Sequence, residues 1–119
     1  MLQTLKKRQD FLRLQGQGRQ YKARSFVCLG LVYAAPPGLR VGFTATKKAL
    51  GPKAVDRNRA KRRLRAAVQQ VLSQPAWGPA RTGRGEVVLI ARAPVLTQPF
   101  PALCAELQTA LNQLWAAGL

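Results

Sequence analysis

A densely basic segment, residues 53–65, most constrains the fold that this chain can adopt. Its sequence, KAVDRNRAKRRLR, holds seven lysines or arginines in thirteen residues and a single acidic residue, Asp56. Like charges four residues apart repel each other on a helix and destabilise it. No glutamate lies four residues from any of these cations. Packing against the rest of the protein, a polyanionic partner, or both must therefore stabilise this segment.

Apolar residues continue through and beyond the basic segment at helical spacing, which predicts one helix over residues 54–72. They are Ala60, Leu64, Ala67, Val68 and Val71. At about 100° per residue these side chains fall on one side of the helix. A contiguous polar strip lies on one flank and consists of Asn58, Lys61, Arg62, Arg65 and Gln69. We expect the apolar side to dock on a sheet, the strip to face outward, and Asp56 or Asn58 to cap the helix.

The remaining patterns predict an α+β protein. Residues 10–15 are expected to form a short helix with Asp10 as its N-cap, and a small extra strand is expected near residues 18–22. Residues 25–34, SFVCLGLVYA, are apolar on both alternations, which is typical of a central strand covered on both faces. A Pro-Pro-Gly turn at 35–38 joins it to a strand at 39–46, so residues 25–46 are predicted to form a hairpin.

A Pro/Gly-rich loop at 73–85, a strand at 86–92 and a helix at 99–117 complete the chain. The last helix has an apolar stripe of Leu103, Leu107, Ala110, Leu111 and Leu114. The order α-β-β-β-α-β-α predicts a two-layer α/β sandwich, with a sheet of about four strands and three helices.

The charge balance indicates the class of partner. The 119 residues correspond to one domain, with 20 lysines and arginines against 4 acids and a formal charge of +16. Residues 1–9 are expected to be a flexible basic N-terminus. Such an excess favours a nucleic acid first and an anionic membrane surface second. A membrane helix would need bulky apolar residues on its buried side, whereas the stripe of the 54–72 helix is mostly Ala and Val, so nucleic acid is favoured.

The composition also limits the chemistry of the chain. Histidine is absent, which removes the commonest general base and metal ligand. The four acids are far apart in the sequence and are expected to be mostly ion-paired, so a metal-dependent nuclease site is poorly provided for. No signal peptide or membrane span is recognisable, so we expect a cytoplasmic protein in which Cys28 and Cys104 are reduced and structural.

A single RNA strand suits the sequence better than a duplex. No helix-turn-helix, zinc-finger or heptad pattern occurs. In the strand at 39–46, Gly42, Thr44 and Thr46 share one face, which a ligand could approach closely, although an ordinary Gly/Thr strand beneath a loop is an equal interpretation. An aromatic residue such as Phe11 and a flanking arginine strip would bind unpaired bases and phosphates.

Residues 39–68, LRVGFTATKKALGPKAVDRNRAKRRLRAAV, closely resemble the signature of the bacterial ribonuclease P protein subunit. The matching features are the Lys-Lys pair after a strand, a short loop, Ala-Val, and an Arg-Asn-Arg block followed by Lys-Arg. Upstream, the Asp-Phe, Gly and Phe-Val positions of the family correspond to residues 10–11, 18 and 26–27, and IARAP at 90–94 fits its fourth strand.

This resemblance implies a subunit that pairs with a catalytic RNA and binds the 5′ leader of precursor tRNA. The RNA would perform the hydrolysis with Mg²⁺, and the protein would supply no catalytic group and bind no metal or cofactor itself. The family fold also includes a left-handed β-α-β crossover, against the usual right-handed rule. The protein alone is expected to be a monomer that does not bind membranes.

By position, the resemblance assigns two groups of residues. The RNA-binding group comprises Lys47, Lys48, Arg57, Asn58, Arg59, Lys61, Arg62 and Arg65. The leader cleft would be lined by Phe11, Val27, Leu29 and Thr44, with Lys48 at its rim. Two alternatives remain open: a ribosomal-type RNA-binding protein without preference for a leader, and a protein-only nuclease built on one of the four acids.

Overall fold

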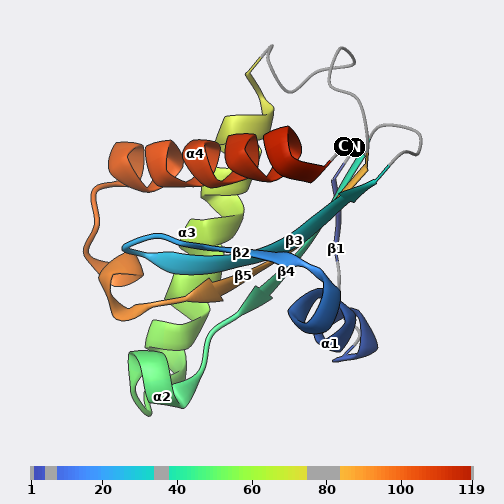
Figure 1. Cartoon of the computed structure of the whole chain (residues 1–119). Coiled ribbons are helices and arrows are strands. Elements are labelled where there is room, and N and C mark those ends of the chain that lie inside the picture. The colour runs from blue at the N-terminus through green and yellow to red at the C-terminus, as the bar shows by residue number, and fades with distance from the viewer. Residues whose placement is uncertain (1, 5–7, 34–37, 75–83, 119) are drawn as a thin grey trace.

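One mixed sheet organises the protein in the computed structural model, which describes residues 2–4, 8–33, 38–74 and 84–118 (Figure 1). Its strands are β1 (Leu2–Thr4), β2 (Arg19–Lys22), β3 (Phe26–Tyr33), β4 (Gly38–Thr44) and β5 (Arg84–Ala91). The helices are α1 (Arg8–Gln17), α2 (Lys47–Leu50), α3 (Ala54–Leu72), the 3-10 helix η2 (Ala93–Leu96) and α4 (Phe100–Gly118). The spatial order of the strands is β1-β4-β5-β3-β2.

Helices α3 and α4 cover one face of the sheet, and α1 lies against the other (Figure 1). The α3/α4 face holds the main core, because alternate residues of β3 and β5 point into it, among them Phe26, Cys28, Val87 and Leu89, all fully buried. The apolar stripe predicted for α3 and the one predicted for α4 are both buried in this core. Both helical stripes were therefore predicted correctly.

The α1 face carries a smaller cluster in which Leu14 of α1 packs on Leu29 and Val88. Helix α1 reaches the sheet closely because glycine follows its last residue. A Cβ on Gly18 would lie 2.5 Å from the Leu14 carbonyl oxygen and 2.9 Å from that of Gly30. Gly18 N–H donates to that same Leu14 oxygen at 2.8 Å, which ends α1 and turns the chain into β2.

Strand pairing corrects one prediction. Strands β3 and β4 do not form a hairpin, because β5 lies between them, antiparallel to β3 and parallel to β4. Six of the eight β5 residues are buried, five of them in one unbroken run, and the most apolar strand gains most from neighbours on both sides. The β4–β5 pair is joined through α2 and α3 as a β-α-β crossover. The predicted turn at 35–38 and most of the loop at 73–85 lie outside the described residues.

The helix starts also differ from the predictions. Helix α1 begins at Arg8, so Asp10 lies inside it and is not its N-cap. The N-cap of α3 is Lys53, without a side-chain capping bond, so neither Asp56 nor Asn58 caps it. Asp56 lies in the first turn instead, where a carboxylate complements the helix dipole. Strand β1, which pairs in parallel with β4 at the sheet edge, and the short helix α2 were not predicted.

Candidate nucleic-acid interface

The predicted RNA-binding group lies on α2, α3 and the connection between them. We call its members the basic strip: Lys47, Lys48, Arg57, Asn58, Arg59, Lys61, Arg62 and Arg65. All are exposed except Arg57 and Lys61, which are half-buried. Because the opposite side of α3 is in the core, the strip is held on a rigid support, and its side chains face solvent.

Three hydrogen bonds order α2 and its connection to α3. Thr46 caps α2 by accepting a hydrogen bond from Ala49 N–H at 3.2 Å. The Arg57 guanidinium donates to the carbonyl oxygens of Gly51 at 3.3 Å and Pro52 at 3.0 Å. These bonds tie the first turn of α3 to the preceding loop. Lys47 and Lys48 therefore belong to the same surface as the α3 cations.

The strip keeps its positive charge. Within residues 38–74 and 84–118, no carboxylate forms an ion pair with a cation of α2 or α3. The Arg65 guanidinium lies 5.4 Å from the centre of the Phe43 ring, a cation–π contact that leaves its charge in place. Arg63, on the other flank of α3, instead donates to the backbone oxygens of Val95 and Gln98 and holds η2. The helix thus separates structural from solvent-facing arginines.

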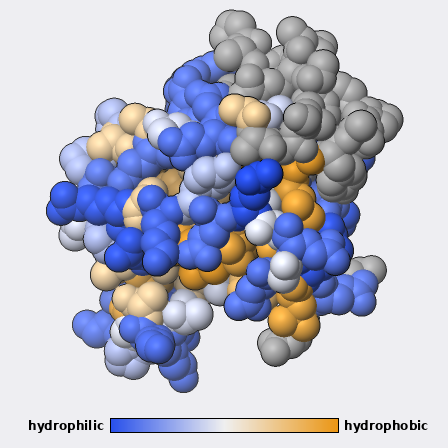
Figure 2. All heavy atoms as spheres, viewed as in Figure 1, coloured by the Kyte–Doolittle hydropathy of each residue, from blue (hydrophilic) through white to orange (hydrophobic). Residues whose placement is uncertain are grey.

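The predicted leader-cleft residues lie on the α1 face of the sheet. Strand register places Thr44 beside Ile90 and Ile90 beside Val27, so the three form one row across β4, β5 and β3. Each is partly exposed, and Phe11 of α1, Val27 and Ile90 all pack against the smaller cluster. We call this surface the groove. In Figure 2 apolar surface is visible in a hollow between α2–α3 at lower left and α1 at lower right.

Two predicted positions behave differently from the others. Leu29 is only 6% exposed because Leu14 of α1 covers it, so it supports the groove and offers little surface to a ligand. Lys48 follows Thr44 by four residues and lies in α2, so the chain passes directly from the groove row into the basic strip. The groove and the strip are therefore neighbouring parts of one surface.

The prediction missed three residues of this face. Ile90 forms the middle of the groove row, and Lys22 pairs with Val27 at its outer end. Glu86, which is 3% exposed, accepts from the Arg13 guanidinium of α1 and, at 2.9 Å, from Arg40 of β4. The alternation of β5 could have placed Glu86 and Ile90 on one face, but their partners depend on strand order. The Glu86 ion pairs fasten α1 to the sheet beside the groove.

Comparison with known proteins identifies the family. The model of the ribonuclease P family, described as "Ribonuclease P", matches residues 2–115. The chain belongs to the ribonuclease P protein family. A ribonuclease P protein component from Paramagnetospirillum magneticum is 39% identical over 125 residues, covering 97% of this chain and 84% of the relative. One from Symbiobacterium thermophilum is 46% identical over 99 residues, covering 83% and 79%.

Solved ribonuclease P proteins share the fold. The Staphylococcus aureus protein superposes with a TM-score of 0.68 at 23% identity, covering 97% of this chain and 95% of that one. The Thermotoga maritima protein gives 0.65 at 23% identity, covering 96% of both chains. The predicted α+β fold is confirmed, and the chain is a protein component of ribonuclease P, which processes tRNA.

The described residues of this ribonuclease P protein include few side chains that could bind a catalytic metal ion or act as a nucleophile. No three His, Cys, Asp or Glu side chains among them gather into a possible metal site. Burial raises the pKa of the Cys28 thiol to about 12 and also raises the pKa of Cys104. Both cysteines are free thiols, as predicted. In the same part of the chain, no helix is long and apolar enough to cross a bilayer.

Proposed function

We propose that this protein binds the ribonuclease P RNA through the basic strip and the single-stranded 5′ leader of precursor tRNA through the groove. The observation that carries the proposal is the adjacency of the two surfaces along the chain, because Thr44 of the groove row precedes Lys47 and Lys48 by only three and four residues. The row of Thr, Ile and Val side chains thus adjoins helices whose cations form no ion pair within the described residues. Bound together, these surfaces would place the leader next to the RNA that cuts it.

The groove has the features that a single strand requires. Thr44, Ile90 and Val27 give a partly exposed floor, and Phe11 supplies an aromatic side chain on which an unpaired base can stack. Stacking of this kind tolerates any base, because every base has a π-face. The groove would therefore accept leaders of varied sequence.

The basic strip has the features that folded RNA requires. Arginine binds phosphate oxygens with two parallel hydrogen bonds and is less strongly hydrated than lysine. Arg59 and Arg62 are exposed and carry no carboxylate partner among the described residues. Six or so phosphate contacts would give a log–log salt dependence of binding steeper than about −4.

The proposal assigns hydrolysis of the phosphodiester to the partner RNA and its Mg²⁺. The chain contains no histidine, and the most buried described carboxylate, Glu86, is held by two guanidinium groups. Among the described residues, no set of acidic side chains fitted to Mg²⁺ is present, and this protein's own part is to bind and position RNA. We further propose that the protein acts in the cytoplasm, as a monomer until it joins the RNA.

A double variant tests the assignment of the basic strip. Arg59→Ala with Arg62→Ala should weaken assembly with the catalytic RNA and slow precursor cleavage at low Mg²⁺, because two phosphate contacts are lost. The matched control is Arg19→Ala with Arg24→Ala, which removes the same charge from exposed positions beside β2. Circular dichroism and urea unfolding should show both variants folded. Equal cleavage by the two variants would overturn the assignment.

A further inference from the structure

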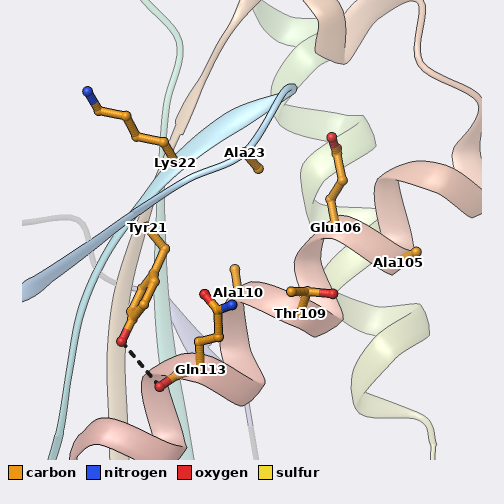
Figure 3. Close-up of a pocket in the computed structure, with 8 residues that line it drawn as sticks. All are labelled: Tyr21, Lys22, Ala23, Ala105, Glu106, Thr109, Ala110 and Gln113. Atoms are coloured by element: carbon orange, nitrogen blue, oxygen red, sulfur yellow. Dashed lines mark hydrogen bonds between the residues drawn. The ribbon is translucent and has the colours of Figure 1, made fainter.

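A pocket of about 420 Å³ lies between the edge strand β2 and α4, on the opposite side of the sheet from the groove. Glu106, Thr109 and Gln113 line it from α4, where spacings of three and four residues put them on one side of the helix. Figure 3 shows Tyr21 bordering it from β2, with the Lys22 side chain pointing away from α4. The proposed function uses none of the α4 residues.

The pocket holds an acceptor without a donor. The Oε2 atom of Glu106 is buried, and no group within the described residues forms a hydrogen bond with it. A buried carboxylate oxygen that lacks a donor is costly. The orphaned oxygen points to a ligand that brings hydrogen-bond donors to this position.

The wall opposite Glu106 is fixed in place. The Tyr21 hydroxyl donates to the backbone oxygen of Gln113 at 3.2 Å, which joins β2 to α4. The ring is half-buried against the core, so its orientation is set before a ligand binds. A planar ligand could lie along such a ring. The volume is within the range of small-ligand pockets and is large enough for one nucleobase.

Among the four RNA bases, a carboxylate selects guanine. Guanine presents two neighbouring donors, N1–H and the N2 amino group, which match the two oxygens of one carboxylate. Adenine and cytosine each place one donor next to an acceptor that would face a carboxylate oxygen, and uracil places one donor between two carbonyls. We propose that this pocket binds an unpaired guanine of RNA, with the Glu106 side chain turning its buried Oε2 atom toward the base so that the carboxylate accepts from N1–H and N2–H.

The position of the pocket connects it to the groove, and to that extent the proposal rests on the proposed function. Lys22 lines the pocket and also ends the groove row beyond Val27. Because β2 is an edge strand, an RNA strand leaving the groove can pass over it, with the exposed Lys22 near its phosphates. The guanine could belong to the leader or to the catalytic RNA.

The test compares guanine with inosine, which lacks only the N2 amino group. Binding of short single-stranded RNAs carrying guanine, inosine or adenine at one position is measured by fluorescence anisotropy with wild type, Glu106→Gln and Asp56→Asn. Asp56→Asn removes the same charge outside the pocket, and should change affinity for all three RNAs alike. Wild type should prefer guanine over inosine by at least about fivefold, the low end for a bidentate base contact. Glu106→Gln should lose that preference.

Replacing leader guanines by inosine in the holoenzyme assay shows which RNA supplies the guanine that the pocket binds. A fall in precursor affinity with wild type but not with Glu106→Gln assigns the pocket to the leader. Preference in short RNA without a leader effect assigns it to the catalytic RNA. Equal binding of guanine and inosine by wild type, or a preference that Glu106→Gln retains, would overturn the proposal. If the protein stimulates cleavage without a guanine preference, the inference fails while the proposed function stands.

Discussion

The two faces of the sheet are built from alternate residues of the same strands, yet one is sealed and the other is partly open. On the α3/α4 face, Phe26 and Leu89 are fully buried. On the α1 face, their neighbours Val27 and Ile90 remain partly exposed beside a buried ion-paired carboxylate. The difference lies in coverage, because two 19-residue helices pack on one face and one 10-residue helix on the other. Stability is concentrated on one face, which leaves apolar surface on the other for a ligand.

The largest expected effect comes from replacing, one at a time, two neighbouring residues that lie on opposite faces of the sheet. Phe26→Ala should lower the free energy of unfolding by about 3–5 kcal/mol, since it removes a fully buried ring. Val27→Ala should cost only about 1 kcal/mol, because the side chain is half-exposed, while weakening leader binding. Urea unfolding and leader binding measured on both variants check this. Similar stability losses would break the comparison.

The attachment of α1 to the open face gives the second effect. Glu86→Gln should lower the free energy of unfolding by about 2–3 kcal/mol. This loss is smaller than is usual for breaking a buried ion pair, because the side chains of Arg13 and Arg40 are 35% and 31% exposed and can turn to water. Amide hydrogen exchange should accelerate in α1 before it does in α3. Asp56→Asn, at a half-exposed acid on α3, is the control and should cost about 0.5 kcal/mol; unchanged exchange in α1 would contradict the role of Glu86.

The smallest effect concerns the buried thiol of the sealed face. The folded pKa of Cys28 is about 12, above its ordinary 9.0, so the unfolded chain loses this proton first as pH rises. The contribution of the protonated Cys28 thiol to the free energy of unfolding is thus complete below pH 9.0. It is lost between pH 9.0 and 12, by about 1.4 kcal/mol per pH unit. Wild type and Cys28→Ala, compared by unfolding at pH 8 and about pH 10, should converge in stability by roughly that amount. If the difference in stability between the two proteins stays the same at both pH values, the Cys28 thiol is not shielded from solvent as the structure has it.

Local patterns predicted the sealed face well and the open face less well. The bounds of α3 and its five buried residues follow from helical spacing, and α4 follows equally well. The hairpin prediction failed because β5, distant in sequence, pairs between β3 and β4, and local patterns do not contain that pairing. For the same reason Ile90, which lies between Thr44 and Val27, was not predicted, whereas those two residues were assigned to the leader cleft by the resemblance alone.

The charged residues show the same limit. The basic strip was recognisable from the sequence because its members lie close together in the chain, on α2 and α3, and its role in binding RNA stays a prediction. Glu86 was expected only to be ion-paired in general, and its partners Arg13 and Arg40 come from elements far apart in sequence. The caps at Asp10 and Asp56 were wrong because both helices begin earlier than their first suitable side chain.

Cleavage of precursor tRNA at low Mg²⁺ tests the central claim most directly, with protein alone, catalytic RNA alone, and the two mixed. We expect cleavage in the mixture only, because the protein supplies binding surfaces and the RNA performs the hydrolysis. Cleavage by the protein alone would contradict this and direct attention to its four acidic residues. RNA binding without any stimulation of cleavage would contradict it equally and would leave a general RNA-binding protein.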